Sequence, residues 1–135
     1  MKKMERLTSQ EEKAMRRLWA IGDGTIKDIL SGYAYPQPPY TTLASIVKNL
    51  EQKGYVKARK VGNTYLYRPL VEEKNYKCHS LARIVNDYFG NSYKELVSFF
   101  VKENNISTEE LKEMLALIEQ DNSANIHKPS KEPEA

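Results

Sequence analysis

Apolar side chains recur at helical spacing three times in the first half of the chain, and each recurrence predicts a helix. The first helix begins at the capping box of residues 8–11 and ends at the glycine-rich residues 22–24. A short second helix covers residues 25–30, and a third covers residues 40–53 and stops at Gly54. The third helix has one apolar face, predicted to point inward, made by Leu43, Ile46, Val47 and Leu50.

Two short runs rich in β-forming residues follow the third helix. Residues 55–61 and 64–69 flank Gly62-Asn63, a pair typical of a two-residue hairpin turn. Tyr65 and Tyr67 alternate to one face of the second strand, which favours a core position over a nucleotide-stacking role. Three helices followed by a β-hairpin wing predict a winged helix-turn-helix, and the fold class is mainly α with an all-α region behind the wing.

After the hairpin the pattern is helical only, with three further apolar stripes. Ser92 and a capping box at residues 107–110 mark the starts of two of these helices. About 50 residues of helix bury too little surface to close a core alone, so the stripes are predicted to meet a second copy of the chain. The predicted dimerisation positions are Leu81, Ile84, Val85, Tyr88, Phe89, Leu96, Val97, Phe100, Leu111, Leu115 and Ile118.

The predicted organisation is a winged-helix DNA-binding domain at 1–70, a helical dimerisation domain at 71–120 and a disordered polar tail at 121–135. Charge supports this division. The 135 residues have a net charge of +3, yet residues 1–70 hold 13 Lys/Arg against 6 Asp/Glu, whereas residues 71–135 hold 8 against 12. The basic first half is therefore predicted to bind a polyanion and the acidic second half to mediate interactions.

The outward face of the third helix has the composition of a DNA-reading surface. Its side chains are polar, mostly short and almost free of acid, and Thr hydroxyls and methyls suit base edges. The predicted reading residues are Tyr40, Thr41, Thr42, Ser45, Lys48 and Asn49. Helix capping is an alternative role for the two threonines, compatible with reading. The basic side chains of the hairpin that are predicted to contact DNA phosphates are Lys57, Arg59, Lys60 and Arg68. The alternative is that these side chains form a solvated strand face.

The sequence offers little for catalysis or metal binding. One cysteine forms no internal disulfide, and Cys78-His79 lacks further ligands, so Cys78 is predicted to pack and His79 to lie at the surface. Without a glycine-rich phosphate loop or a nucleophile–base pair, the protein is predicted to be no enzyme and to use no metal or cofactor. The absence of a secretory leader and of an apolar stretch of roughly 20 residues predicts a cytoplasmic protein.

Three ordered segments resemble the penicillinase-repressor family (BlaI/MecI/CopY). They are Pro-Tyr-Thr-Thr-Leu at 39–43, Leu-Glu-Gln-Lys-Gly-Tyr-Val at 50–56 and Tyr-Leu-Tyr-Arg-Pro-Leu at 65–70. The first helix is similar to that of the family too, and the likeness extends over residues 7–119. Each fragment alone is a weak signal, whereas the ordered set is specific.

The resemblance implies a homodimeric repressor that binds an inverted-repeat, palindromic operator on double-stranded DNA. In the family's β-lactam-responsive members a membrane-bound sensor-protease cuts the dimerisation domain and releases the DNA. The scissile bond maps onto Phe99–Phe100, where Phe99 replaces the family's usual Asn, and Asn49 replaces an Arg common in the third helix. The paired Cys-x-Cys motifs of the copper-responsive branch are absent, so the resemblance favours antibiotic resistance over copper sensing.

Other interpretations fit part of the pattern. A winged helix can serve as a protein-interaction module, and it would then bind duplex DNA no better than background. A repressor of this family could also answer a different inducer without cleavage. A nucleic-acid enzyme on the same scaffold would need a set of acidic metal ligands, which residues 40–70 lack.

Overall fold

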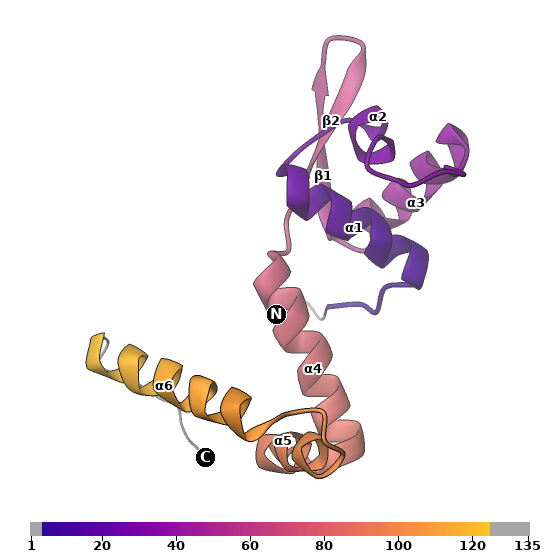
Figure 1. The fold of residues 1–135 in the computed structure, drawn as a ribbon. Coiled ribbons are helices and arrows are strands. Elements are labelled where there is room, and N and C mark those ends of the chain that lie inside the picture. The colour runs from indigo at the N-terminus through magenta and orange to yellow at the C-terminus, as the bar shows by residue number, and fades with distance from the viewer. Residues whose placement is uncertain (1–3, 125–135) are drawn as a thin grey trace. The chain divides into compact units, whose positions relative to one another are not determined.

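The structure is a computed structural model that describes residues 4–124, with the backbone alone for residues 121–124. It divides into two compact units, Met1–Arg83 and Ile84–Ala135, whose boundary lies inside one helix. The first unit contains three helices, a two-stranded sheet and the start of a fourth helix (Figure 1). The bounds of these elements are α1 Ser9–Ile21, α2 Ile26–Leu30, α3 Tyr40–Gln52, β1 Val56–Val61, β2 Thr64–Pro69 and α4 Glu73–Phe89.

The hydrogen bonds at the helix ends confirm the predicted starts and stops. Thr8 Oγ1 accepts from the Glu11 backbone N at 3.1 Å, and Glu11 Oε1 accepts from the Thr8 N at 2.9 Å. Thr25 and Asp28 form the same reciprocal pair at the start of α2. α1 ends at Gly22, whose φ of +89° favours glycine over any other residue. Short-range signals therefore suffice to set these helix limits.

One hydrophobic core lies between the three helices of the first unit. Leu43, Val47 and Leu50, on the predicted inward face of α3, are each no more than 1% exposed, and Ile46 is partly buried against them. Burying a side chain of this size contributes about 1.5–3 kcal/mol relative to leaving it exposed. This packing fixes which face of α3 points outward. The remaining buried core residues are Ala14, Met15, Leu18, Ile26, Ile29, Tyr55, Val56 and Tyr76.

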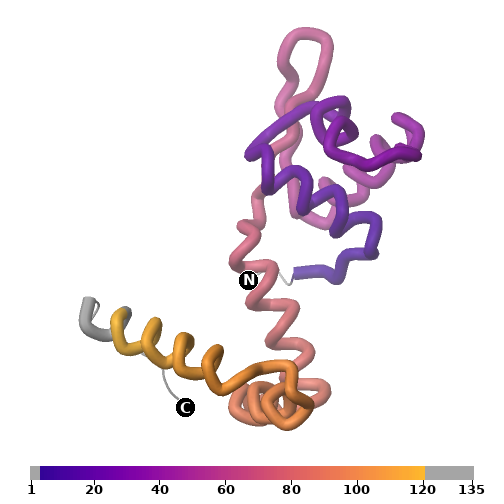
Figure 2. The backbone as a smooth tube through the Cα atoms, in the orientation of Figure 1, coloured from indigo at the N-terminus to yellow at the C-terminus, as the bar shows by residue number. Residues whose placement is uncertain are grey.

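A short backbone bridge attaches the hairpin to the helices. β1 and β2 pair antiparallel, and the tube in Figure 2 shows their turn extending beyond the helices of this unit. The Gly24 N donates to the Tyr67 carbonyl at 3.0 Å, and the Tyr67 N donates to the Gly24 carbonyl at 2.8 Å. A Cβ on Gly24 would lie 2.7 Å from Ile21 Cδ1 and 3.0 Å from Asp28 Cβ, so a side chain here would require these neighbours on α1 and α2 to shift.

The start of α4 is anchored to the first unit by aromatic side chains. Trp19 Nε1 donates to the Val71 carbonyl at 2.9 Å, just before α4 begins. The Tyr76 ring lies 5.6 Å from the Trp19 ring and 5.9 Å from the Tyr55 ring, measured between centroids. The Tyr76 hydroxyl donates to the Glu12 carboxylate. The compact unit therefore continues past the wing and into α4.

The second unit contains the remainder of α4 and two further helices, α5 Tyr93–Lys102 and α6 Thr108–Ala124. Ser107 and Glu110 form the predicted capping box of α6, because the Ser107 N donates to Glu110 Oε1 at 2.9 Å and the Glu110 N donates to Ser107 Oγ at 3.1 Å. α6 continues to the last described residue, which falls within the segment predicted as a tail. Residues 125–135 of that tail lie outside the described residues.

The burial predicted for several individual side chains is wrong. Tyr65 was expected in the core but is 49% exposed, since it lies near the tip of a hairpin that extends beyond the helices, whereas Tyr67 packs against the core. Cys78 was expected to pack but is exposed, because Tyr76 occupies the face of α4 that points to the core. His79, expected at the surface, is partly buried.

Candidate nucleic-acid interface

The side chains predicted to read DNA all lie on the exposed face of α3. Leu43, Val47 and Leu50 point the opposite way into the core, so the helical periodicity alone brings the polar positions together. Tyr40 in the first turn is 51% exposed although it is aromatic. The exposed set consists of Tyr40, Thr41, Thr42, Ser45, Lys48 and Asn49. The face offers hydroxyl, amide and ammonium groups over three turns of helix.

The amino end of α3 has no side-chain cap. Its N-cap residue is Pro39, which carries no side-chain oxygen, whereas α1 and α2 each begin at a threonine cap. Thr41 and Thr42 therefore do not cap this helix, which was the alternative role considered for them. No acidic side chain lies in the first turn. Uncapped amide donors at a helix N-terminus attract anions, and phosphate is the common example.

The wing cations divide between the two faces of the hairpin. Lys57 pairs with Arg68 across the ladder and Arg59 follows on the same face, and these three side chains border a hollow of about 440 Å³. Asp23, from the segment before α2, also lines this hollow. Lys60 alternates to the opposite face of β1. All four cations are exposed, and none forms an ion pair with another described residue.

Two carboxylates of the first unit, those of Glu11 and Asp28, are held in structural contacts. Glu11 is 4% exposed, and Lys53 Nζ lies 2.6 Å from its Oε1. Burial opposes ionisation of Glu11, but the hydrogen bonds from Lys53 and Thr8 together outweigh it and hold the pKa below its ordinary value. The backbone hydrogen bond from Thr25 likewise lowers the pKa of Asp28. Asp23 beside the wing and Glu51 on α3 remain as nearby acidic side chains, so the positive charge of this surface is compensated only in part.

The aromatic anchor of α4 was not anticipated from the sequence. Burial, reinforced by the hydrogen bond to Glu12, raises the pKa of Tyr76 to about 12. Burial also raises the pKa of Tyr55. The available signal was one aromatic residue within the otherwise polar stretch 72–79. The anchor fixes the start of α4 against the same unit that contains α3 and the wing.

Most side chains predicted to mediate dimerisation are exposed in the single chain. Val85 is fully buried, whereas Tyr88 is 77% exposed and Ile118 is 56% exposed. Apolar exposure on this scale is typical of an interaction surface rather than of a finished monomer surface. The other exposed members are Leu81, Ile84, Val97, Phe100 and Leu115. The partly buried members are Phe89, Leu96 and Leu111. Four exposed apolar side chains of the same helices lie outside the predicted set, namely Tyr93, Phe99, Met114 and Leu117.

The bond between Phe99 and Phe100 lies inside α5. Phe99 is 48% exposed, and its ring contacts the Phe89 ring with centroids 5.7 Å apart. The Phe99 carbonyl accepts a hydrogen bond from the Glu103 N at 3.0 Å, and the Phe100 carbonyl accepts one from the Asn105 N at 2.9 Å. The bond is thus reachable at the surface while its backbone remains folded.

Other site classes find no geometric support within the described residues. No group of three or more His, Cys, Asp or Glu side chains converges there as metal ligands would. None of the described helices combines the length and the apolar composition needed to cross a bilayer. The described surface features are therefore a polar recognition face, a basic wing and apolar helix faces.

The chain resembles known repressors along most of its length. The sequence model of the penicillinase repressor family matches residues 7–120. The penicillinase repressor of Bacillus licheniformis is 25% identical over 126 residues, which cover 89% of this chain and 94% of that protein. The methicillin resistance regulatory protein MecI of Staphylococcus aureus (strain N315) is 26% identical over 73 residues, or 54% of this chain and 59% of MecI. The solution structure of the DNA-binding domain of the repressor BlaI aligns with 56% of this chain and 94% of that domain, with a TM-score of 0.49 and 21% identity. The chain belongs to the penicillinase repressor family of DNA-binding transcriptional repressors.

Proposed function

We propose that this repressor inserts α3 into the major groove of an operator and holds the flanking phosphates with its wing. The observation that carries the proposal is the pairing, in one unit, of an exposed short polar helix face with an unpaired basic hairpin. Short hydroxyl and amide side chains can approach base edges closely, and longer cations reach the backbone. The protein acts in the cytoplasm and by binding alone, without a catalytic step.

The two contact classes have different tasks in this proposal. Thr41, Thr42 and Ser45 at the entering end of α3 read base edges, and the uncapped helix N-terminus faces a phosphate. Lys57 and Arg59 follow the backbone from the same face of the hairpin, and this contact carries no sequence information. Lys60 on the opposite face contributes only to the surrounding positive potential.

The working form is a homodimer, joined through the exposed apolar faces of the last three helices. Two-fold symmetry of the protein requires an inverted-repeat operator, because each winged helix meets one half-site. Half-sites then lie whole helical turns apart, at multiples of roughly 10–10.5 base pairs. Tethering two weak half-site readers raises the overall affinity by about 10²–10⁴-fold.

Release of DNA follows from cutting the bond between Phe99 and Phe100. A membrane-bound sensor-protease activated by a β-lactam would make the cut, which separates Phe100 and all of α6 from the winged helix. The dimer would lose apolar contact surface, and each winged helix would lose the tether that joins it to the other one. The alternative is a repressor that answers a different inducer without cleavage, and the exposed Phe99 is then ordinary interface packing.

Operator binding separates these roles experimentally. DNA that co-purifies with the protein from cells is sequenced to obtain the operator, and binding is then titrated at several salt concentrations. We expect Thr41→Val and Thr42→Val each to weaken operator binding by roughly 1–3 kcal/mol, the size of one base contact, with no effect on random DNA. Lys57→Gln or Arg59→Gln should weaken all DNA alike and reduce the salt slope by about one unit.

The matched control is Lys74→Gln, a lysine exposed on α4 that makes no described ion pair. It should bind as the wild type does. Threonine variants that bind the operator with wild-type affinity would remove α3 from the reading role. Duplex binding no stronger than background by the wild type would instead favour a protein-interaction module.

A further inference from the structure

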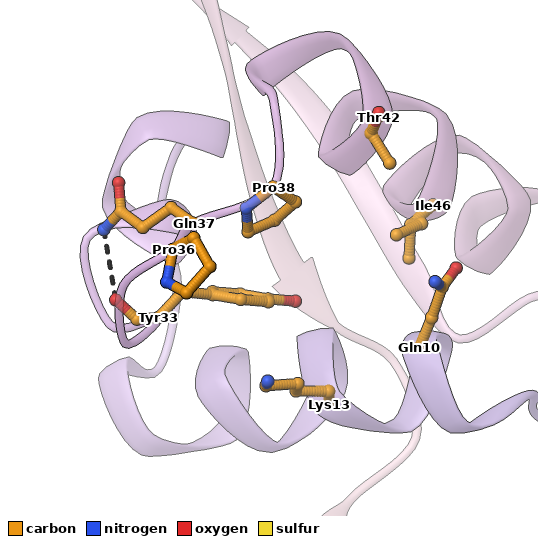
Figure 3. A pocket seen from close by; sticks show the side chains of 8 residues that line it. All are labelled: Gln10, Lys13, Tyr33, Pro36, Gln37, Pro38, Thr42 and Ile46. Carbon is orange, nitrogen blue, oxygen red and sulfur yellow. Dashed lines mark hydrogen bonds between the residues drawn. The ribbon is translucent and has the colours of Figure 1, made fainter.

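A cavity of about 300 Å³ lies beside the outward face of α3, at the size where small-ligand pockets begin. α1, α3 and the segment between α2 and α3 each supply part of its wall (Figure 3). The lining residues are Gln10, Lys13, Tyr33, Pro36, Gln37, Pro38, Thr42 and Ile46. Of the lining residues, Ile46 and Tyr33 also pack against the core and Thr42 belongs to the predicted reading face.

The Tyr33 hydroxyl is a buried donor without a partner. In Figure 3 the Tyr33 ring extends between Pro38 and Lys13, and its hydroxyl points toward the side of the cavity formed by Ile46 and Gln10. The hydroxyl oxygen is buried and makes no hydrogen bond with any described residue. Burial raises the pKa of this group, so it remains a proton donor. An unsatisfied buried donor is costly, which favours an acceptor entering from outside.

The loop holds Tyr33 in this position from its backbone side. Gln37 Nε2 donates to the Tyr33 carbonyl and to the Leu30 carbonyl, both at 3.1 Å, and the Tyr33 N donates to Leu30 O at 2.9 Å. These bonds fix the backbone while leaving the hydroxyl end of the side chain unpaired. The donor is thus preorganised, and a ligand need not order it.

The charge of the cavity favours an anion. Lys13 Nζ lies 5.2 Å from the centroid of the Tyr33 ring and forms no ion pair with a described residue. No acidic side chain lines the cavity, Gln10 adds a further donor group, and Thr42 presents its methyl group to it (Figure 3). Pro36, Pro38 and Ile46 provide an apolar wall that an inorganic anion would leave uncovered.

We propose that this cavity binds a small organic carboxylate with an apolar ring or short chain. The carboxylate accepts the Tyr33 hydroxyl hydrogen bond and faces the Lys13 ammonium, while its apolar part packs on the two prolines and Ile46. A DNA phosphate shares the negative charge, but it has no apolar part to cover that wall. The Tyr33 hydroxyl is also buried, out of reach of a convex duplex surface.

A bound carboxylate would compete with DNA for Thr42, and this consequence rests on the proposed role of α3. Thr42 belongs both to the cavity wall and to the predicted reading face. A ligand packed against the Thr42 side chain in the free protein hinders its approach to a base edge and so lowers affinity for the operator, and operator binding lowers affinity for the ligand by the same factor. Ligand binding without DNA tests the cavity, whereas DNA binding without ligand tests the proposed function, so the two can fail separately.

The test uses the full chain without DNA and titrates it with benzoate, benzyl alcohol and inorganic phosphate by calorimetry and by NMR chemical shifts. We expect benzoate to bind at least tenfold more tightly than either other probe. Lys13→Gln should weaken benzoate roughly tenfold, the loss of one hydrogen bond to a charged group, and Lys13→Arg should restore most of it. Lys74→Gln, on exposed α4, is the matched control and should leave benzoate binding unchanged.

Tyr33→Phe separates a ligand-binding role from a structural one. Removing the unpaired hydroxyl should leave the melting temperature of the free protein equal or higher, while it weakens benzoate binding by roughly two- to tenfold. A lower melting temperature with unchanged benzoate affinity would overturn the proposal. Equal binding of benzoate and benzyl alcohol would overturn the anion preference, and tighter binding of phosphate would assign the cavity to the DNA backbone.

Discussion

Glu11 performs two structural tasks at once in the first unit. Its carboxylate completes the capping box of α1 through Thr8, and it pairs with Lys53 at the end of α3. Lys53 Nζ also donates to the Arg6 carbonyl at 3.0 Å, so the ammonium is held from two sides. The pair thereby connects the start of α1 to the carboxyl end of α3.

This pair predicts a specific dependence of stability on pH. The folded pKa of Glu11 lies below the ordinary value of 4.5, so the stabilisation is complete above that value and is lost as the pH falls through the folded pKa. We expect Lys53→Met to lower the free energy of unfolding at pH 7 by roughly 1.5–3 kcal/mol. The difference from wild type should narrow as Glu11 becomes protonated. Urea unfolding followed by Trp19 fluorescence over a pH series measures both effects.

The control for this experiment is an exposed lysine–glutamate ion pair. Lys77 and Glu73 on α4 lie 3.6 Å apart with side chains 69% and 46% exposed, and such pairs contribute little. Lys77→Met should therefore change the unfolding free energy by no more than about 0.5 kcal/mol at any pH. A Lys53→Met deficit of constant size from neutral to acidic pH would mean that lost packing, and not the ion pair, causes it.

At the scale of elements, the attachment of α4 depends on one aromatic side chain. Tyr76→Phe keeps the ring against Trp19 and loses the bond to Glu12, so we expect a loss of about 0.5–1.5 kcal/mol in unfolding free energy. Tyr76→Ala removes the ring as well and should cost about 3–5 kcal/mol. Hydrogen exchange should then show the first two turns of α4 losing protection before the core of α3 does.

Asn75→Ala provides the control on the same helix turn, since Asn75 is exposed. It should stay within about 0.5 kcal/mol of wild type and leave exchange unchanged. If Tyr76→Ala changed stability without increasing exchange in α4, the anchor would be a core residue only. The structural link between the DNA-reading unit and α4 would then have to lie elsewhere.

Local patterns predicted the elements well, and the outward face of α3 followed from them. Helical spacing defines both faces of a helix at once, so burying Leu43 and Leu50 also exposed Thr41 and Lys48. Strand alternation similarly determines that Lys60 points away from the other wing cations. These predictions needed only residues close in sequence, which is the range over which periodicity carries information.

Contacts between distant segments were not predictable in this way. Tyr76 meets Trp19 more than 50 residues away, and the Gly24 bridge to Tyr67 spans more than 40. No periodic signal connects such positions, so the extent of the first unit could not be inferred from the sequence. The exposure of Tyr65 depends on how far the hairpin extends beyond the helices, which is also a tertiary property.

At the scale of the whole molecule, the exposed apolar side chains of α6 predict a dimer that acidic substitutions on this helix would dissociate. Leu115→Glu with Ile118→Glu should dissociate it, because each truncated interface anchor costs about 2 kcal/mol or more, or roughly thirtyfold in the dimer dissociation constant. Analytical ultracentrifugation of the full chain measures this. Ala116→Glu with Gln120→Glu adds the same charge on the opposite side of α6 by helical spacing and should remain dimeric. A wild-type chain that sediments as a monomer at micromolar concentration would exclude the proposed interface.

The proposed proteolytic release would depend on how easily α5 opens. A protease needs an extended segment, and α5 is ten residues long with no fully buried side chain, so local unfolding costs far less than global unfolding. We expect immunoblots of the native host after β-lactam exposure to show a fragment that ends near Phe99.

Phe99→Asn, which restores the family's usual residue, should be cut faster, and Phe100→Ala should be cut more slowly. Operator affinity of the cut protein should fall by about 10²–10⁴-fold as the tether is lost. An intact band in cells whose target gene is nonetheless derepressed would rule out cleavage and favour an inducer that acts by binding.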